Sequence, residues 1–533
     1  MFSNTSAELS LNTPSKCISS VPNDTSNHRF LVGTCALSSA STSSFMGGNG
    51  EIPSNSLYLL RYHEEMNELA VDAQLNFGDG NGEEDGSGEM WCMSSCPMDK
   101  TLLVSCRDNC NGNGAETALW RIPEKAMRED EIDYYPDEMD GGGGFNRNFS
   151  SDMNEIMEKV DLLRYDNDLH SDSHMTAIGG GDIERSAVLK GRVSDLQWNP
   201  DCLPHSDDGT AAGGGGGVNF LTVDHTINGN PTMTTWDIGT SAAIPVNRVC
   251  VPSNERKAVL NSFTVPNPPR ASWDPHNTNL IATTAGLNVA VADIRTGYTV
   301  LTLKQCHKFG VTDVDHNPNK PNILSSCGQD SLVKFWDLRY SSTSFDDNGS
   351  KMEVSTPTST SMRQQPLRIL RGGHMHWSTR VKYNSFHDQL LLSGGTDGMV
   401  NLWRVSSISS APLLDLGNTS NDDVGHDKDF GLSAFSGLDE DEEEKVRRVL
   451  DNDDDGEDLS FSGNDKIANQ ASFSDDTDGG NAPDVRVTKM EMRDAVYDLE
   501  WSAADPWVYV TLSFDGNVVL NHVPSKEKYK ILL

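Results

Sequence analysis

The sequence has little positive charge, few hydrophobic residues and no long apolar run. It carries 42 Lys and Arg against 79 Asp and Glu, which gives a formal net charge of −37. Binding to a phosphate backbone or to anionic lipid needs clustered cations, so neither nucleic acid nor a membrane is an expected direct partner. No stretch of about 18 apolar residues occurs, so no transmembrane helix is predicted.

The N-terminal region also lacks the features of a targeting segment. Residues 1–20 are polar and rich in Ser and Thr, without the basic start and apolar core of a signal peptide. A transit peptide is disfavoured by Glu8 and by the absence of Arg before Arg29. We therefore expect a cytoplasmic protein whose ten cysteines are reduced thiols.

Motifs for catalysis and for metal binding are missing as well. The sequence contains neither a G-x-S-x-G nor an H-E-x-x-H motif, so neither an enzyme nor a cofactor is predicted. The segment Asp451–Ser462 resembles a calcium loop, but it ends on Ser462 where a bidentate Glu is needed. Two C-x-x-x-C pairs are better explained as core thiols than as a zinc site. These pairs are Cys92, Cys96, Cys106 and Cys110.

The composition predicts one folded body interrupted by polar insertions. Only 36% of the residues are hydrophobic, and 46 are Gly. We predict a disordered N-terminal segment at 1–28 and a folded domain at 29–533, with a polar insertion at 124–183 and a Gly-rich loop at 206–217. An acidic insertion at 421–480 has 20 Asp and Glu against 5 Lys and Arg, and is expected to be disordered. It is either a solvated loop or a docking tail for a basic partner.

A repeat unit extends from Cys306 to Arg339. Short apolar segments are separated in it by the turn residues Asn317-Pro318-Asn319 and Gly328-Gln329-Asp330. We expect strands at 311–316, 323–326 and 332–337, a pattern typical of an all-β protein. The same pattern returns from His374 to Arg404.

In both units an Asp precedes a Trp by six residues, and this spacing resembles the WD40 repeat. In that repeat a His, a Ser or Thr, the Asp and the Trp form a hydrogen-bonded tetrad. Buried polar groups stabilise a fold only when each finds a partner, which explains why the four occur together. The matching residues are His307, Ser326, Asp330 and Trp336 in one unit, and His374, Ser393, Asp397 and Trp403 in the other.

Weaker copies of the unit bring the number to seven. They lie near Arg29–Tyr62, Glu89–Pro123, Val193–Gly239, Ala271–Arg295 and Val496–Val523. We therefore predict an all-β, seven-bladed WD40 β-propeller with long acidic and Gly-rich insertions, in preference to an open β-sandwich. The C-terminal KYKILL is expected to add an edge strand where the ring closes.

Several stretches go beyond the generic repeat. HDQLLLSGGTDG (His387–Gly398), WSAADPW (Trp501–Trp507), SFDG (Ser513–Gly516) and the terminal KYKILL are not demanded by blade geometry. With RFLVGT near the start and the frame at Glu89–Asp99, they resemble the EARP and GARP complex-interacting protein family of WD40 propellers. The resemblance spans both ends of the domain and leaves out the polar insertions.

The resemblance implies a non-enzymatic scaffold that binds vesicle-tethering complexes. It implies a role in endosomal recycling and in endosome-to-trans-Golgi trafficking, with a peripheral location at the trans-Golgi network and endosomes. The large insertions distinguish this chain from compact relatives. They leave open which loops remain accessible to a partner.

Three residues are candidates for a partner surface. His376 and Trp377 open the sixth unit without a role in its tetrad, and Trp377 either packs between blades or anchors a partner. Trp336-Asp337-Leu338-Arg339 resembles the W-D-x-R ending of the DWD box. This second resemblance implies an alternative function as a substrate receptor of a cullin-RING ubiquitin ligase, with Arg339 facing the cullin adaptor.

Overall fold

The structure of the chain, a computed structural model, describes twelve stretches. They are residues 6–36, 55–78, 88–109, 114–127, 154–163, 193–200, 220–225, 231–238, 243–251, 268–339, 365–411 and 484–532. The Gly-rich loop at 206–217 and the acidic insertion at 421–480 were predicted from sequence, and both lie outside the described residues.

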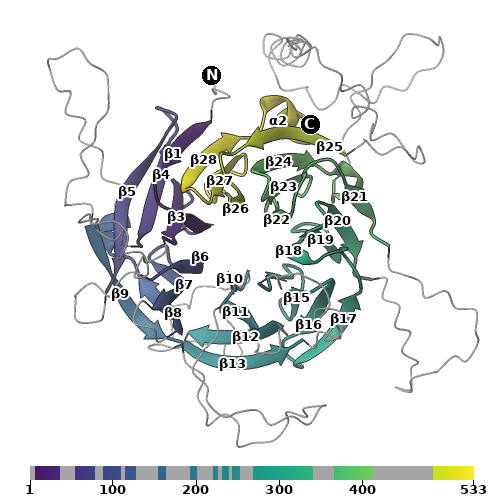
Figure 1. The fold of residues 1–533 in the computed structure, drawn as a ribbon, viewed down its shortest axis with the longest axis horizontal. Coiled ribbons are helices and arrows are strands. Elements are labelled where there is room, and N and C mark those ends of the chain that lie inside the picture. Colours follow the sequence, from purple (N-terminus) through teal and green to yellow (C-terminus); the bar gives the residue numbers. More distant parts are fainter. Residues whose placement is uncertain are drawn as a thin grey trace, which may run out of the picture.

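The described strands surround a central axis in radially arranged sheets (Figure 1). Five sheets have four strands each, and one sheet has eight. In four of these five sheets the first strand in the chain lies next to the axis and the last on the rim, whereas in the fifth β26 lies next to the axis and β1 on the rim; neighbouring strands are antiparallel. This is a β-propeller, so the predicted fold class is confirmed.

The eight-stranded sheet consists of two four-stranded halves joined at the rim. The halves are β2–β5 and β6–β9, and each is antiparallel within itself. They join because β9 pairs in parallel with β5 through residues 154–157. We treat these halves as blades 1 and 2, which gives a numbering of seven blades.

Blades 1 to 3 hold the following strands. Blade 1 contains β2 (Ser15–Ser20), β3 (His28–Thr34), β4 (Leu57–His63) and β5 (Glu68–Phe77). Blade 2 contains β6 (Met90–Ser95), β7 (Leu102–Asn109), β8 (Gly114–Arg121) and β9 (Asn154–Leu162), with a 3-10 turn at Glu124–Met127. Blade 3 contains β10 (Asp195–Trp198), β11 (Phe220–His225), β12 (Pro231–Ile238) and β13 (Ala243–Cys250).

Blades 4 to 7 complete the ring. Blade 4 contains β14 (Ala271–Trp273), β15 (Leu280–Ala285), β16 (Asn288–Asp293) and β17 (Tyr298–Leu303). Blade 5 contains β18 (Val311–His316), β19 (Ile323–Gly328), β20 (Val333–Asp337) and β21 (Arg368–Leu370). Blade 6 contains β22 (Ser378–Tyr383), β23 (Leu390–Gly395), β24 (Met399–Arg404) and β25 (Val485–Glu491), with a 3-10 turn at Ser406–Ile408. Blade 7 contains β26 (Val496–Trp501), β27 (Val508–Ser513) and β28 (Asn517–His522), and its rim strand is β1 (Ala7–Ser10).

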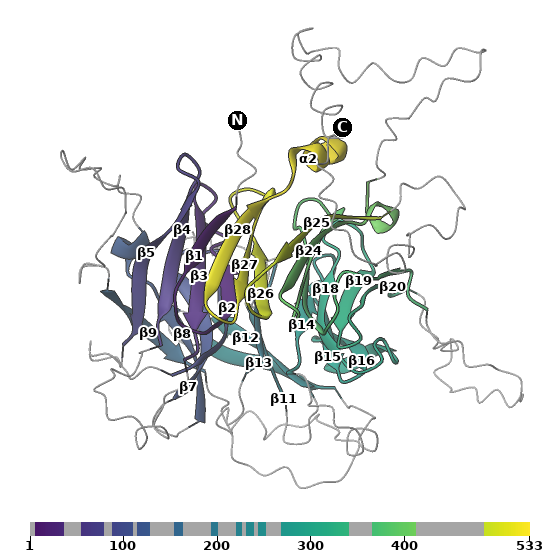
Figure 2. The same ribbon diagram turned by 45° about the horizontal axis from the view of Figure 1, so that its top comes forward.

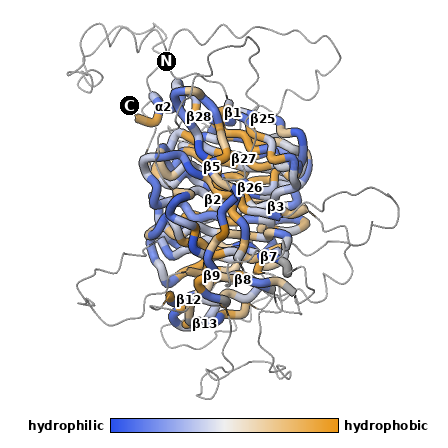
Figure 3. Tube along the Cα trace, turned by 90° about the vertical axis from the view of Figure 1, so that its left-hand side faces the viewer, coloured by the Kyte–Doolittle hydropathy of each residue, from blue (hydrophilic) through white to orange (hydrophobic). Residues whose placement is uncertain are grey.

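The core lies between neighbouring blades, because a single blade is too small to bury its own apolar face. Leu31, Leu57 and Leu75 of blade 1 pack in one cluster with Leu103 and Trp120 of blade 2. Phe30 and Leu60 of blade 1 pack in another cluster with strands of blade 7. Hydrophobic and hydrophilic residues therefore interleave along the chain trace (Figure 3).

The prediction that residues 1–28 are disordered is wrong. The first strand, β1, pairs with β28 from Ala7↔Leu520 to Ser10↔Asn517 and supplies the fourth strand of blade 7. The next strand, β2, lies beside the axis and buries Cys17 and Ile18. The polar composition hid both strands, since each is short and has few large apolar residues.

Two further predictions need correction. All but the last residue of the C-terminal KYKILL belongs to helix α2 (Ser525–Leu532), which follows β28 outside the ring of sheets (Figure 2). Lys, Glu and Leu favour a helix, and Glu527 forms ion pairs with Arg404 of blade 6 and with Lys530 one helical turn on. The polar insertion at 124–183 contains the 3-10 turn and β9, so part of it belongs to blade 2.

Candidate functional site

The structure brings the four residues of the blade 5 tetrad into one hydrogen-bonded chain. His307 Nδ1 lies 2.6 Å from Asp330 Oδ1, and His307 Nε2 lies 2.8 Å from Ser326 Oγ. Trp336 Nε1 donates to the same Ser326 Oγ at 2.8 Å. Asp330 Oδ2 also accepts from the backbone N–H of Lys308, so the tetrad fixes the loop that enters β18.

The blade 6 tetrad repeats this geometry with a longer contact to the carboxylate. His374 Nε2 lies 2.8 Å from Ser393 Oγ, and Trp403 Nε1 donates to Ser393 Oγ at 2.9 Å. His374 Nδ1 lies 3.3 Å from Asp397 Oδ1. Asp397 Oδ2 accepts from the backbone N–H of Met375, which holds the loop before β22.

The carboxylates of both tetrads have lowered pKa values. Burial alone would raise the pKa of Asp397, but the hydrogen bonds from His374 and from backbone N–H groups lower it to about 2. The same balance lowers the pKa of Asp330, where Lys334 contributes as well. Burial lowers the pKa of His307, which favours its neutral form. Each tetrad thus links the strands of its own blade by hydrogen bonds.

Polar side chains of the innermost strands line a central channel with a cavity of about 420 Å³. At each blade two residues, separated by one position in sequence, face it. The first of these two sets comprises Cys17, Cys92, Asp195, Arg270, Asp313, Arg380 and Asp498. The second set comprises Ser19, Ser94, Gln197, Ser272, Asp315, Lys382 and Glu500.

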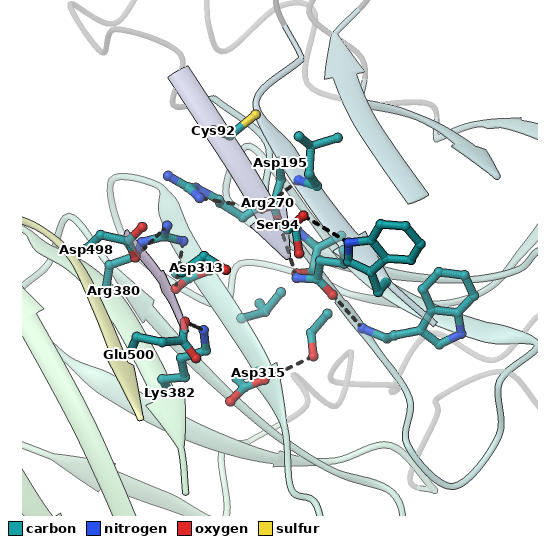
Figure 4. Close-up of a pocket in the computed structure, with 18 of the residues that line it drawn as sticks. Cys92, Ser94, Asp195, Arg270, Asp313, Asp315, Arg380, Lys382, Asp498 and Glu500 are labelled. Carbon is teal, nitrogen blue, oxygen red and sulfur yellow. Dashed lines mark hydrogen bonds and ion pairs between the residues drawn. The ribbon is translucent and has the colours of Figure 1, made fainter. Parts of the chain in front are cut away.

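Acids and bases alternate around the first set from blade 3 to blade 7. Arg380 Nη2 lies 2.8 Å from Asp498 Oδ1, and Arg380 Nη1 lies 3.7 Å from Asp313 Oδ2 (Figure 4). Arg270 Nη1 lies 3.5 Å from Asp195 Oδ1. The neighbouring carboxylates raise the pKa of Arg380 against the opposing effect of burial. The charges of the channel therefore compensate one another within the chain.

The carboxylates of the channel also bond to the next blade. Asp195 accepts from the N–H of Ala271 at 2.9 Å, Asp313 from Val381 at 3.1 Å, and Asp498 from Ile18 at 3.1 Å. In the second set, Asp315 accepts from the N–H of Tyr383 at 2.7 Å. The innermost strand of the next blade has no paired strand on the side of the channel. Each acid thus supplies the hydrogen-bond acceptor that a backbone N–H group of that strand would otherwise lack.

Asp315 differs from the other channel acids in having a strongly raised pKa. Burial raises the pKa of this carboxyl to about 7, against the hydrogen bond from Tyr383 and the charge of Lys382. Asp313 adds to the rise, and burial raises the pKa of Asp313 as well. Lys382 itself pairs with Glu500 across the boundary between blades 6 and 7 (Figure 4).

The candidate partner residues lie apart from the channel charges. Trp377 is 39% exposed and stacks on His376, with ring centroids 5.2 Å apart. Its backbone carbonyl accepts from the N–H of Thr396, so the loop is fixed while the ring stays half-exposed. Arg339 follows β20, and its guanidinium binds Asp337 with Nη2–Oδ2 at 2.6 Å and Nε–Oδ1 at 2.9 Å.

The sequence alone missed several exposed apolar residues on the same face as Trp377. Phe309 precedes β18 and Met375 precedes β22, and Met375 is 90% exposed. Tyr497, at the start of β26, is also exposed. The signal that could have found them is position, because all lie at or just before the N-terminal end of an innermost strand.

The described residues contain no group of three or more His, Cys, Asp or Glu side chains placed to hold a metal ion. Within the same residues, Cys92 and Cys106 lie opposite one another in β6 and β7, and Cys96 follows β6; all three are buried. Burial raises the pKa of Cys92 well above its ordinary value. No helix among the described stretches is long and apolar enough to cross a membrane.

Comparison with known proteins agrees with the fold and with the family resemblance. The model of the EIPR1 β-propeller family matches residues 267–403, which contain blades 4 and 5 and most of the first three strands of blade 6. The human EARP and GARP complex-interacting protein 1 is 27% identical over 477 residues, covering 89% of this chain and 91% of the relative. The chain is thus similar over most of its length to proteins named for interaction with the EARP and GARP complexes.

Two other relatives extend the comparison. The EARP-interacting protein homolog of Gekko japonicus is 27% identical over 479 residues, covering 89% of this chain and 91% of that protein. The WD repeat-containing protein DWA2 of Arabidopsis thaliana is 21% identical over 508 residues, covering 95% of this chain and 93% of that protein.

Replacing Asp330 by Ala should destabilise blade 5. The change removes the partner of His307 Nδ1 and of the Lys308 N–H, and an unpaired buried donor costs about 1–3 kcal/mol. We expect a lower melting temperature in a thermal unfolding experiment. An unchanged melting temperature would show that the tetrad contributes nothing to stability.

Replacing Asp315 by Asn should change how stability depends on pH. Because the pKa of Asp315 is raised to about 7 in the folded state, folding favours its protonated form. The stability that protonated Asp315 contributes is fully present below the pKa of Asp in the unfolded chain, near 4. It is lost as the pH rises to about 7. The unfolding free energy of D315N minus that of the wild type should therefore increase from pH 5 to pH 7, by at most about 1.4 kcal/mol per pH unit.

Denaturant titrations at pH 5, 6, 7 and 8 would measure this difference. Glu65→Gln, which neutralises an exposed carboxylate, serves as the control and should show no such increase. A difference between D315N and the wild type that is constant across the pH range would contradict the raised pKa.

Proposed function

We propose that the chain is a protein-interaction scaffold that binds vesicle-tethering complexes of the EARP and GARP type. In this role it acts without catalysis in endosomal recycling and in endosome-to-trans-Golgi trafficking, from a peripheral position on those membranes. The observation that carries the proposal is the similarity over about nine-tenths of the chain to proteins named for interaction with these complexes.

Two features of the structure support a binding role. The channel charges are engaged with one another and with neighbouring blades, so they serve the fold. Apolar side chains are instead exposed at the entrance of blades 5 and 6, on loops that the tetrads hold. Exposed Trp and Met side chains on a rigid framework are typical anchors of protein interfaces.

Replacing Trp377 by Ala should weaken recovery of tethering-complex subunits in affinity purification of the tagged chain. A half-exposed Trp that anchors a partner contributes at least about 1 kcal/mol, so recovery should fall about fivefold or more. The melting temperature should stay unchanged, because the ring contributes little to the core.

Phe386→Ala is the matched control for this experiment. Phe386 is an exposed aromatic residue in the turn between β22 and β23, at the opposite end of the strand from Trp377. It should leave recovery unchanged. Failure of the wild type to recover any tethering subunit would count against the proposed function, and a loss of stability in W377A would assign Trp377 to the core.

A second candidate function is a substrate receptor of a cullin-RING ubiquitin ligase. It is supported by the W-D-x-R ending at Trp336–Arg339 and by the similarity to the plant protein DWA2. The Arg339 side chain is 61% exposed, although Asp337 binds one edge of its guanidinium. Arg339 can therefore contact a partner protein either while it remains paired with Asp337 or after that ion pair has opened.

Replacing Arg339 by Ala should abolish co-precipitation of the cullin adaptor if this second function holds. The fold should persist, since Arg339 lies after the end of β20 and its guanidinium is on the surface. Arg295→Ala, an exposed Arg at the corresponding place after β16, is the control and should keep the adaptor bound. A wild-type chain that never binds the adaptor would exclude this function.

A further inference from the structure

Five innermost strands share an irregularity at one position. The pairing of each with its neighbour in the blade skips one residue directly before the first channel residue. Such a bulge turns the extra side chain in a new direction and is frequent beside binding sites. The five skipped residues are Lys16, Trp91, Thr312, Thr379 and Tyr497.

In blades 5 and 6 the skipped residue joins two blades. Thr312 Oγ1 donates to the backbone carbonyl of Ser378 at 2.5 Å, and Thr379 Oγ1 donates to that of Val496 at 2.7 Å. Ser194 takes the same place before β10 and donates to the carbonyl of Pro269 at 2.6 Å. A small hydroxyl side chain at this position therefore serves the fold.

Blades 7, 1 and 2 depart from this rule at three consecutive positions. Tyr497, Lys16 and Trp91 are too large for the short inter-blade hydrogen bond of a Ser or Thr. They gather on the same face instead. Lys16 Nζ lies 4.1 Å from the centre of the Trp91 ring and 5.9 Å from that of Phe514, and Phe514 lies 5.2 Å from Tyr497 between ring centres.

These four residues, Lys16, Trp91, Tyr497 and Phe514, form what we call the mouth cluster. None of them is buried, and Tyr497 is 36% exposed. Aromatic rings at this degree of exposure in a structural position cost stability that a Ser or Thr would not cost, so blade geometry does not explain them. The cluster continues the series of exposed apolar residues formed by Phe309, Met375 and Trp377 in blades 5 and 6.

Two carboxylates lie beside the mouth cluster in the chain. Glu89 lies two residues before Trp91, and Asp494 lies three residues before Tyr497. Among the residues that the structure describes, neither carboxylate forms an ion pair. Within the described residues, Lys16 is the cation of the cluster itself, and Arg493 beside Asp494 is paired with Glu8 Oε1 at 3.1 Å. Two carboxylates without an ion pair thus accompany one ammonium group, so the surface is complementary to a basic ligand.

Lys16 shows which chemical group the cluster accommodates. Its ammonium group already lies over the Trp91 ring, in the geometry of a cation–π contact. The Tyr497 and Phe514 rings, tilted by 39° to one another, offer a second aromatic surface beside the Asp494 carboxylate. An aromatic face next to a carboxylate is suited to Arg or Lys, which use both the ring and the charge.

We propose that the mouth cluster is the docking site for a basic, extended peptide segment of a partner protein. An Arg or Lys of the segment stacks on Tyr497 and pairs with Asp494, and an adjacent apolar residue packs against Phe514 and Trp91. This site deepens the proposed scaffold function, because it gives the chemistry of the segment that the face accepts.

Selection from a phage-displayed library of random dodecapeptides tests this site without any assumption about the natural partner. The full chain is the bait, and phage that also bind Tyr497→Thr are removed. We expect the remaining peptides to carry Arg or Lys next to an apolar residue. Enrichment of acidic peptides, or no enrichment over Tyr497→Thr, would overturn the proposal.

Fluorescence polarisation with the most enriched labelled peptide gives the affinities. Tyr497→Thr and Trp91→Thr install the residue found at Thr312 and Thr379, so both variants should fold, and each should weaken binding at least about tenfold. The matched control is Tyr298→Thr, an exposed Tyr on the rim strand β17, which should bind as the wild type does. Equal affinities for all four proteins would contradict the site.

A charge reversal separates a loss of binding from a loss of folding. Asp494 is exposed, so Asp494→Lys should keep the wild-type melting temperature and lower the affinity for the peptide at least about fivefold. The affinity of the wild-type chain for the peptide should also fall as the salt concentration is raised from about 50 to about 500 mM, because exposed charges are screened. Tighter binding to Asp494→Lys would overturn the proposal. If these peptides bind but tethering complexes fail to co-purify, the proposed function would be rejected while the peptide site would stand.

Discussion

The ring depends on hydrogen bonds that leave one innermost strand as side chains and end on the backbone of the next. Adjacent innermost strands do not pair with one another as the strands within a blade do, so their N–H groups need other acceptors. The carboxylates of Asp195, Asp313 and Asp498 meet this need at three of the blade boundaries. At others, Ser19 accepts from the N–H of Ser95, and Ser272 accepts from that of His316.

This use of carboxylates determines the charge of the channel. Buried acids that accept backbone hydrogen bonds still need counter-charges, and Arg270 and Arg380 supply them between the three Asp residues. The result looks like a catalytic cluster because acids and bases stand close together in a cavity. Each charged group nevertheless has a partner in the fold. Acids and bases alternate from blade 3 to blade 7, and Cys and Ser side chains occupy the same positions in blades 1 and 2. The role of the carboxylates in joining successive blades accounts for this pairing.

The sequence was most informative where one residue type is required by geometry. The Asp-to-Trp spacing predicted both tetrads and the strands of blades 5 and 6, because the four side chains must meet within one blade. The closure by β1, the rim strand β9 and the helix α2 escaped prediction for a different reason. Their stability comes from pairing with strands that are remote in sequence, as with β1 and β28, or from a contact such as Arg404 with Glu527. Local composition carries little information about such contacts.

The exposed aromatic residues could be recognised only after the strands were aligned in space. Trp91, Tyr497 and Lys16 have unremarkable sequence neighbours, and no motif relates them. Once the bulges are superimposed, they occupy a position where Ser194, Thr312 and Thr379 hold neighbouring blades together. From the other blades one expects a Ser or Thr at this position, and the three large side chains depart from that pattern. Because each of the three large side chains lies at a bulge of a strand that is paired within its blade, the blade framework that the repeat requires also holds these departures in place.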